Sequence, residues 1–176
     1  MSVVDCAKTL NSPLIRIFAG SVPSKNCEPE YFKKVVNDIK TICNIAWRAG
    51  KIVCIKFHRG TLADSTEGIL NLINAANSDN LKTYWSPSPA LTREENQSEL
   101  KVVLPYLENI RVSNWSEKGD RYELKGATDE WQSYIEIVNQ SPKNKNFFLK
   151  FMMNDGLKQL NDDAETLNTW IKLNRK

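Results

Sequence analysis

The chain has 176 residues, of which 41% are hydrophobic and 26% charged, which is the composition of a single globular domain over residues 1–176. Its 24 basic and 21 acidic residues give a formal net charge of +3. Because both signs are spread through the sequence, no nucleic acid and no anionic membrane is predicted as a partner. The sequence has no apolar run long enough to span a membrane and no signal-peptide pattern, so we predict a cytoplasmic protein.

In the first half of the chain, segments with apolar residues at every third or fourth position alternate with short β-branched and aromatic runs. The first pattern predicts helices and the second predicts strands. Ser2 is the expected N-cap of the first helix, and Gly50 the expected stop of the second. In chain order we predict a helix over 3–10, a strand over 14–18, a helix over 30–49, a strand over 52–57 and a helix after Asp64 or Ser65 through residue 76.

The second half continues this alternation. Two prolines in the sequence SPSP at residues 86–89 close a strand, because proline cannot continue a ladder. The predicted elements are a strand over 81–85, a helix after Thr92 to about 104, a strand over 109–113, a polar loop over 114–127, a helix from Thr128 or Asp129 to 139, a strand over 147–152 and a helix over 157–173. Five strands alternating with helices predict a parallel sheet with helices packed outside it.

The strand over 52–57 carries the first sign of a functional site. It is an apolar run between Gly50 and Gly60, which predicts a strand buried on both faces. Because alternate side chains of a strand share a face, Lys56 and His58 are expected on one face at its carboxyl end, where parallel α/β folds bind ligands. The sequence contains neither GxGxxG nor GxxxxGK[ST], so nucleotide binding is not predicted.

Six blocks of the sequence carry a family resemblance when taken together: LIRIFAG, IKFHRGTLADSTEGILNLI, LKTYWSPSP, LPYLENIRVSNW, DEWQSYIEIV and FFLKFMMNDGLKQLNDDAETLNTWI. They resemble the sugar phosphate isomerase/epimerase family, the xylose isomerase-like TIM barrels, over nearly the whole chain. The resemblance implies an α/β fold, a partial (β/α) TIM barrel with about five parallel strands and outer helices. Because an eight-stranded barrel needs about 250 residues, we expect the chain to match the later strands and to lack the first two or three β/α units.

The same resemblance implies a departure in the chemistry. Members of the family usually hold a divalent metal at the strand ends with two glutamates, an aspartate and a histidine. The glutamate positions fall at Lys56 and Lys150, and a histidine position falls at Arg111. A charged ammonium or guanidinium has no lone pair to offer Mg²⁺, Mn²⁺ or Zn²⁺. We therefore expect no metal site and no other cofactor.

These positively charged residues, together with Arg16 on the first strand, are expected to form a basic bowl at the carboxyl ends of the strands. An anionic group of a small sugar-like ligand could neutralise it, with Arg16 or Arg111 as the bidentate partner. One lysine could instead act as a base or a Schiff-base nucleophile, or the residues could carry no function. The candidate catalytic residues are Lys56, His58 and Lys150; the candidate substrate-binding residues are Arg16, Arg111, Trp85 and Trp115.

Each of these side chains also has a purely structural interpretation. His58 can be a hydrogen-bonded turn residue, and Lys56 can pair with Asp64 or Glu67. Trp85 and Trp115 can stack on a sugar ring or simply pack in the core. Asn154 and Asp155 are expected to cap the last helix. The four cysteines form no CxxC pair, so buried thiols are predicted rather than disulfides or a zinc site.

A partial barrel exposes two sheet edges, and self-association is the simplest way to cover them. We therefore predict a homo-oligomer, or a partner chain that completes the barrel. The favoured function is that of a sugar phosphate isomerase/epimerase-like protein that binds a small anionic or sugar-like ligand. The alternative is a non-catalytic subunit or degenerate remnant that needs self-association or a partner chain.

Overall fold

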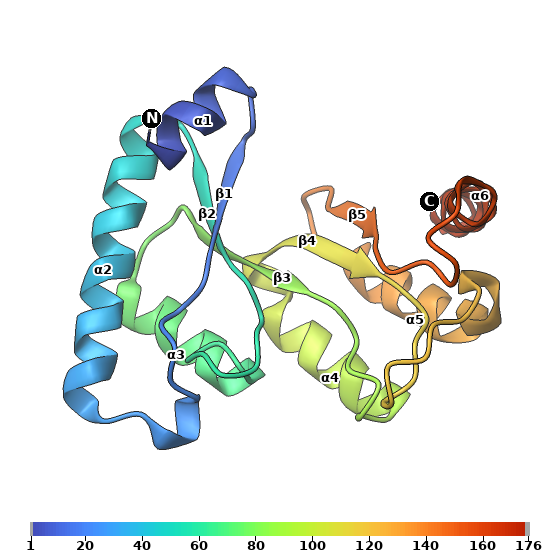
Figure 1. The fold of residues 1–176 in the computed structure, drawn as a ribbon, viewed down its shortest axis with the longest axis horizontal. Helices are drawn as coiled ribbons and strands as arrows, with labels where there is room; N and C mark the ends of the chain where they lie inside the picture. Colours follow the sequence, from blue (N-terminus) through green and yellow to red (C-terminus); the bar gives the residue numbers. More distant parts are fainter. Residues whose placement is uncertain (1, 175–176) are drawn as a thin grey trace. The chain divides into compact units, whose positions relative to one another are not determined.

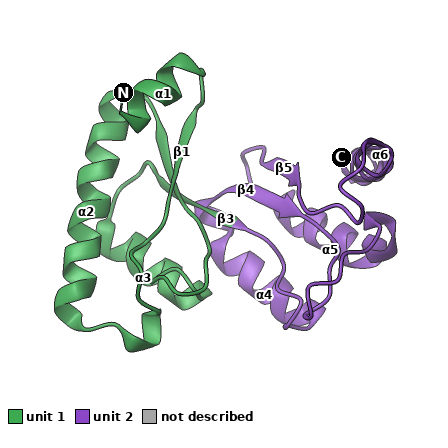
Figure 2. Cartoon of the chain, viewed as in Figure 1, with its two compact units in different colours: residues 1–84 green, residues 85–176 purple. Residues whose placement is uncertain are grey.

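The chain divides into two compact units, residues 1–84 and residues 85–176 (Figure 2). The computed structural model describes residues 2–174. The expectation of one domain over the whole chain stays a prediction, and each unit is described by itself.

Unit 1 is a three-stranded parallel sheet with helices beside it (Figure 1). Strand β2 pairs with β1 on one side and with β3 on the other, and the long helix α2 packs against β2 and α3. Its elements are α1 (Val3–Thr9), β1 (Leu14–Ile17), η1 (Ser24–Asn26), α2 (Pro29–Arg48), β2 (Ile52–Ile55), α3 (Thr66–Ala76) and β3 (Leu81–Trp85), whose last residue falls in unit 2.

The helices of unit 1 begin and end where the sequence predicts. Ser2 and Asp5 form a capping box at the start of α1, and Ser65 caps α3 by accepting the N–H of Gly68 at 3.0 Å. Helix α2 buries one apolar stripe and ends just before Gly50, whose φ of +64° favours glycine. The stripe comprises Val35, Val36, Ile39, Cys43 and Ala46.

Unit 2 contains two parallel strands and three helices (Figure 1). Its core is built around Trp85, Trp131 and Tyr134, three buried rings that meet edge to face at centroid distances of 5.2–6.4 Å. Its further elements are α4 (Arg93–Val103), η2 (Leu104–Tyr106), β4 (Leu107–Val112), η3 (Leu124–Ala127), α5 (Thr128–Val138), β5 (Asn146–Leu149) and α6 (Leu157–Leu173).

The prediction of an α/β fold, a partial (β/α) TIM barrel of five strands with outer helices, is confirmed. The element boundaries differ most at the last strand, which was expected over 147–152 but ends at Leu149. The reason is Phe151, whose φ of +60° takes the backbone out of the extended region. Among residues 2–174, no helix combines the length and the apolar character needed to span a bilayer. Cys43 and Cys54 are buried as predicted, whereas Cys6 and Cys27 are only half-buried.

Candidate functional site

In unit 1, the register of the strands separates an apolar face from a positively charged one. Ile15, Val53 and Leu81 are in register and buried on one face. The next register layer places Arg16, Cys54 and Lys82 side by side on the opposite face. Lys56 lies two residues beyond Cys54, so the alternation along the strand directs it to the face of Arg16.

The side chain that gathers these groups is Phe18, just beyond β1, which is 49% exposed. The guanidinium carbon of Arg16 lies 5.8 Å from the centre of the Phe18 ring, and the Nζ of Lys56 lies 5.0 Å from it. The His58 ring meets Phe18 edge-on at 5.1 Å. We call Arg16, Phe18, Lys56 and His58 the Phe18 cluster. It brings together three of the side chains that the sequence singles out.

The surroundings of His58 fix its tautomer. Its Nδ1 lies 2.6 Å from the carbonyl oxygen of Arg59, and because a carbonyl can only accept, Nδ1 carries a hydrogen. In the neutral ring, Nε2 therefore keeps its lone pair, and the side chain is exposed. The following loop is held by Asp64, which accepts the N–H (3.1 Å) and the hydroxyl (2.6 Å) of Ser24.

A similar cluster occurs in unit 2, just beyond β5. The Nζ of Lys150 lies 4.1 Å from the centre of the Phe151 ring, and the guanidinium carbon of Arg121 lies 5.2 Å from it. The Trp115 ring stacks on Phe151 at 5.0 Å. We call Trp115, Arg121, Lys150 and Phe151 the Phe151 cluster. An aromatic residue at φ +60° costs about 1–3 kcal/mol, so these contacts hold the backbone in a conformation that it would otherwise avoid.

The remaining predicted site residues of unit 2 lie in different surroundings. Arg111 is half-buried and in register with Phe148. Lys150 follows Phe148 by two residues, so Arg111 and Lys150 share one face of the sheet. Trp85 is only 3% exposed and packs against Trp131 and Tyr134. Of the two roles left open for Trp85, the structure therefore supports packing over ligand stacking.

Sequence reasoning missed several members of these clusters. Phe18 could have been found, because it follows Arg16 by two residues on an alternating strand. Arg121 could not, because the loop over 114–127 has no period from which to place a side chain. The expectation that Asn154 or Asp155 caps α6 is wrong: Gly156 is the N-cap and makes no side-chain bond, while the Asp155 carboxylate pairs with Arg121 at 2.7 Å.

A small cavity of about 180 Å³ adjoins Trp115, between the loops that follow β3 and β4. The buried Asn96 fixes the first loop by accepting the N–H of Ser88 at 2.7 Å and donating to the Ser88 carbonyl at 3.0 Å. Tyr134 also lines the cavity, and burial, with a smaller effect of the nearby Glu130, raises the pKa of its hydroxyl to about 12. This hydroxyl therefore acts as a neutral group at physiological pH.

The residues at the strand ends do not fit the divalent metal that the family resemblance implies. Lys56 and Lys150 stand where the resemblance implies glutamates, and both ammonium groups lie over phenylalanine rings. Within residues 2–174, no three side chains of His, Cys, Asp or Glu gather closely enough to hold a metal ion. A positively charged donor set of this kind attracts anions.

Several solved structures share this fold. A probable 3-DHS dehydratase, AsbF, from Bacillus anthracis matches 99% of this chain with a TM-score of 0.78 at 17% identity. A xylose isomerase domain protein from Planctomyces limnophilus matches 97% with a TM-score of 0.77 at 17% identity. A xylose isomerase-like TIM barrel protein from Mycobacterium smegmatis, in complex with magnesium, matches 98% with a TM-score of 0.71 at 12% identity. The chain spans 68%, 62% and 66% of their lengths, respectively.

No functionally curated protein matches the chain in sequence. The family model described as xylose isomerase-like TIM barrel matches residues 1–162, which is most of the chain. The resemblance inferred from the sequence blocks is thereby confirmed, and the chain belongs to the xylose isomerase-like TIM barrel family.

Proposed function

We propose that this protein binds a small anionic, sugar-like ligand at the carboxyl ends of its strands, and that lysine ammonium groups there take the place of a metal ion. One observation carries the proposal: in each unit, two cations lie over a single phenylalanine ring just beyond a strand. The Phe18 cluster and the Phe151 cluster are therefore two candidate anion sites.

The positive charges of each cluster favour an anionic ligand. Two cations about 6 Å apart repel by roughly 1–3 kcal/mol at effective dielectric constants of 20–40, and a bound phosphate or carboxylate removes this repulsion. Arg16 is exposed, so its guanidinium can hold such a group through two parallel hydrogen bonds. The aromatic ring beneath Lys56 stabilises the charged ammonium. The geometry therefore favours an electrostatic role for Lys56 over the role of Schiff-base nucleophile.

The Phe18 cluster also holds the groups for one kind of proton transfer. The lone pair on Nε2 of His58 can take a proton from the carbon next to a substrate carbonyl. The C–H electron pair then forms an enolate whose negative oxygen the Lys56 ammonium stabilises. Protonation of the other face of that carbon by water, with the abstracted proton leaving His58 for the solvent, gives the epimer. Return of the proton to the neighbouring carbon, with the hydroxyl proton of the first carbon moving to the enolate oxygen, gives the isomer. This is our proposal for an isomerase-like or epimerase-like activity.

Ligand-dependent thermal stability of the full chain tests the binding. We expect millimolar fructose 6-phosphate to raise the melting temperature in the presence of EDTA, inorganic phosphate to raise it less, and fructose to leave it unchanged. Stabilisation without turnover of the phosphosugar identifies a binding subunit rather than an enzyme. An equal response to fructose and fructose 6-phosphate, or a response that requires Mn²⁺, contradicts the proposal.

The lysines are tested by replacing each with methionine, which keeps the length of the side chain and removes the charge. We expect Lys56→Met to weaken phosphosugar binding at the Phe18 cluster, and Lys150→Met to weaken it at the Phe151 cluster, about tenfold each, or about 1.4 kcal/mol. The exposed helix variants Lys40→Met and Lys101→Met are the matched controls. Borohydride with a keto sugar is expected to trap no adduct; an adduct that Lys56→Met or Lys150→Met abolishes would establish the nucleophilic role instead.

A further inference from the structure

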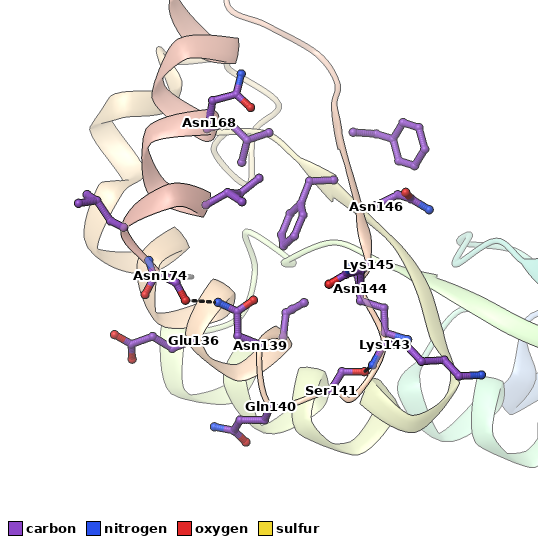
Figure 3. A pocket seen from close by; sticks show the side chains of 16 residues that line it. Glu136, Asn139, Gln140, Ser141, Lys143, Asn144, Lys145, Asn146, Asn168 and Asn174 are labelled. Carbon is purple, nitrogen blue, oxygen red and sulfur yellow. Dashed lines mark hydrogen bonds between the residues drawn. The ribbon is translucent and has the colours of Figure 1, made fainter. Parts of the chain in front are cut away.

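A cavity of about 990 Å³ lies in unit 2 beside β5, at the opposite end of this strand from the Phe151 cluster (Figure 3). We call it the β5 slot. One wall is the end of α5 with the loop that follows it, the second is β5, and the third is the last part of α6. Its lining residues include Asn139, Lys143, Phe147, Phe148, Ile171 and Asn174.

The slot contains a sheet edge. Among the described residues, β4 is the only strand that pairs with β5, and the N–H of Lys150 donates to the Val112 carbonyl at 2.9 Å. Successive amides of an extended strand point to opposite edges, so the N–H and C=O groups of Phe147 and Leu149 face away from β4. Phe147 and Phe148 point to opposite faces of β5, yet both line the slot. A cavity that touches both faces of a strand encloses its edge.

The apolar residues that line the slot suit one extended segment. Leu167 and Ile171 of α6 provide apolar surface on the side of Phe147, and Phe148 is 48% exposed on the other side. Asn139, which also lines the slot, donates to the Asn174 carbonyl at 2.7 Å, a bond that ties the end of α5 to the end of α6 (Figure 3). An incoming strand would therefore find apolar contacts for alternate side chains and hydrogen-bonding partners along its backbone.

The charged residues that line the slot indicate what kind of segment it would bind. Lys143 and Lys145 line the slot with Glu136 as the acidic residue opposing them, so acidic residues at the ends of the bound segment are favoured. The edge strand β1 of a second copy is a poor fit, because it packs against its own helix α1 and its Ile15 is already buried. Carboxamides such as Asn144 and Asn168, which also line the slot, can both donate to and accept from peptide groups.

We propose that the β5 slot binds an extended peptide segment of a partner protein, which adds a strand to the edge of β5 through the amides of Phe147 and Leu149. The segment carries apolar residues at alternate positions and acidic residues at its ends. This inference concerns a surface at the start of β5 and is independent of the ligand site at the carboxyl ends of the strands.

Fluorescence anisotropy with the full chain and the labelled peptide Asp-Val-Thr-Val-Thr-Val-Asp tests the proposal. Two further peptides carry N-methyl groups either on all valines or on all threonines. Because only one of these two sets of amides can face β5, we expect one methylated peptide to bind about tenfold more weakly and the other to bind like the parent. Amide hydrogen exchange at Phe147 and Leu149 should slow on binding, while exchange at Lys150 stays unchanged.

Protein variants complete the test. The double change Lys143→Glu and Lys145→Glu is expected to weaken binding of the acidic peptide about tenfold. The control Lys101→Glu, on the exposed surface of α4, is expected to leave binding unchanged. The proposal is overturned if the parent peptide does not bind at millimolar concentration or if both methylated peptides bind equally. It is also overturned if the slot binds maltotriose instead of the peptide. Occupation by a second copy would overturn it too, and sedimentation would show this as a dimer that dissociates in the double variant.

Discussion

Phe151 combines two features that rarely occur together: a left-handed backbone and a ring in contact with two cations and an indole. Left-handed conformations of bulky residues are unfavourable and persist only where surrounding contacts impose them. The ion pair between Arg121 and Asp155 provides such a contact from the preceding loop. At the residue scale, Phe151 is thus the side chain on which the cluster of unit 2 depends.

Phe151→Leu removes the ring and keeps the unfavourable backbone angle. We expect the free energy of unfolding to fall by about 1–2 kcal/mol, since the stacking and cation contacts are lost, and phosphosugar binding to weaken in parallel. Chemical denaturation and calorimetric titration measure the two effects. Phe148→Leu is the control, because its ring lies on the same strand segment and is half exposed. Equal losses in both variants would show that Phe151 has no special role.

Because of Tyr134, the free energy of unfolding is expected to depend on pH in the alkaline range. Its pKa is raised from 10.0 to about 12, so the folded state holds the hydroxyl proton more tightly than the unfolded state does. The resulting stability is fully present below pH 10 and is lost as the pH rises from 10 to 12, by up to about 3 kcal/mol. Tyr134→Phe is expected to flatten this part of the stability profile, whereas Tyr122→Phe, at an exposed position, should leave it unchanged.

At the scale of elements, the sequence predicts the fold closely because the long helices carry apolar stripes, because α1, α3 and α4 begin at side-chain caps, and because each strand is an alternating or buried run. Lys56 and His58 could be placed on one face in the same way, since they lie on a strand with a fixed period. The Phe151 cluster could not be placed, because Trp115 and Arg121 come from a loop whose path depends on contacts between distant segments, including the bond from Asp155. The end of β5 was misjudged for a related reason: nothing local in the sequence signals a left-handed phenylalanine.

Asn96 on α4 holds the loop after β3. Its side chain donates to the carbonyls of Ser88, Leu91 and Thr92 and accepts the N–H of Ser88. Asn96→Ala removes the acceptor of the Ser88 N–H and the side-chain donor to the Ser88 and Leu91 carbonyls, all of them partly buried, so we expect it to lower the free energy of unfolding by about 1–2 kcal/mol. Thermal and urea denaturation measure the change, with Asn161→Ala at an exposed helix position as the control. A loss under about 0.5 kcal/mol would mean that water replaces the side chain.

At the scale of the whole molecule, the chain keeps the barrel architecture of its family while its strand ends carry charges opposite to those of a metal-binding site. Both compact units contain the same arrangement, a phenylalanine ring with two cations over it. The chain as a whole carries nearly as many acidic as basic residues, with a net charge of +3, so these clusters are local concentrations of positive charge. Under the proposed function, these cations at the strand ends are the feature that would select an anionic ligand.

The most direct measurement is calorimetric titration of the full chain with fructose 6-phosphate in EDTA, repeated with the double variant Lys56→Met and Lys150→Met. We expect the wild-type chain to bind without any divalent ion, rising salt to weaken the binding, and the double variant to lose it while keeping its melting temperature. Binding that appears only with added Mn²⁺ or Mg²⁺, or that survives in the double variant, would contradict the proposed function.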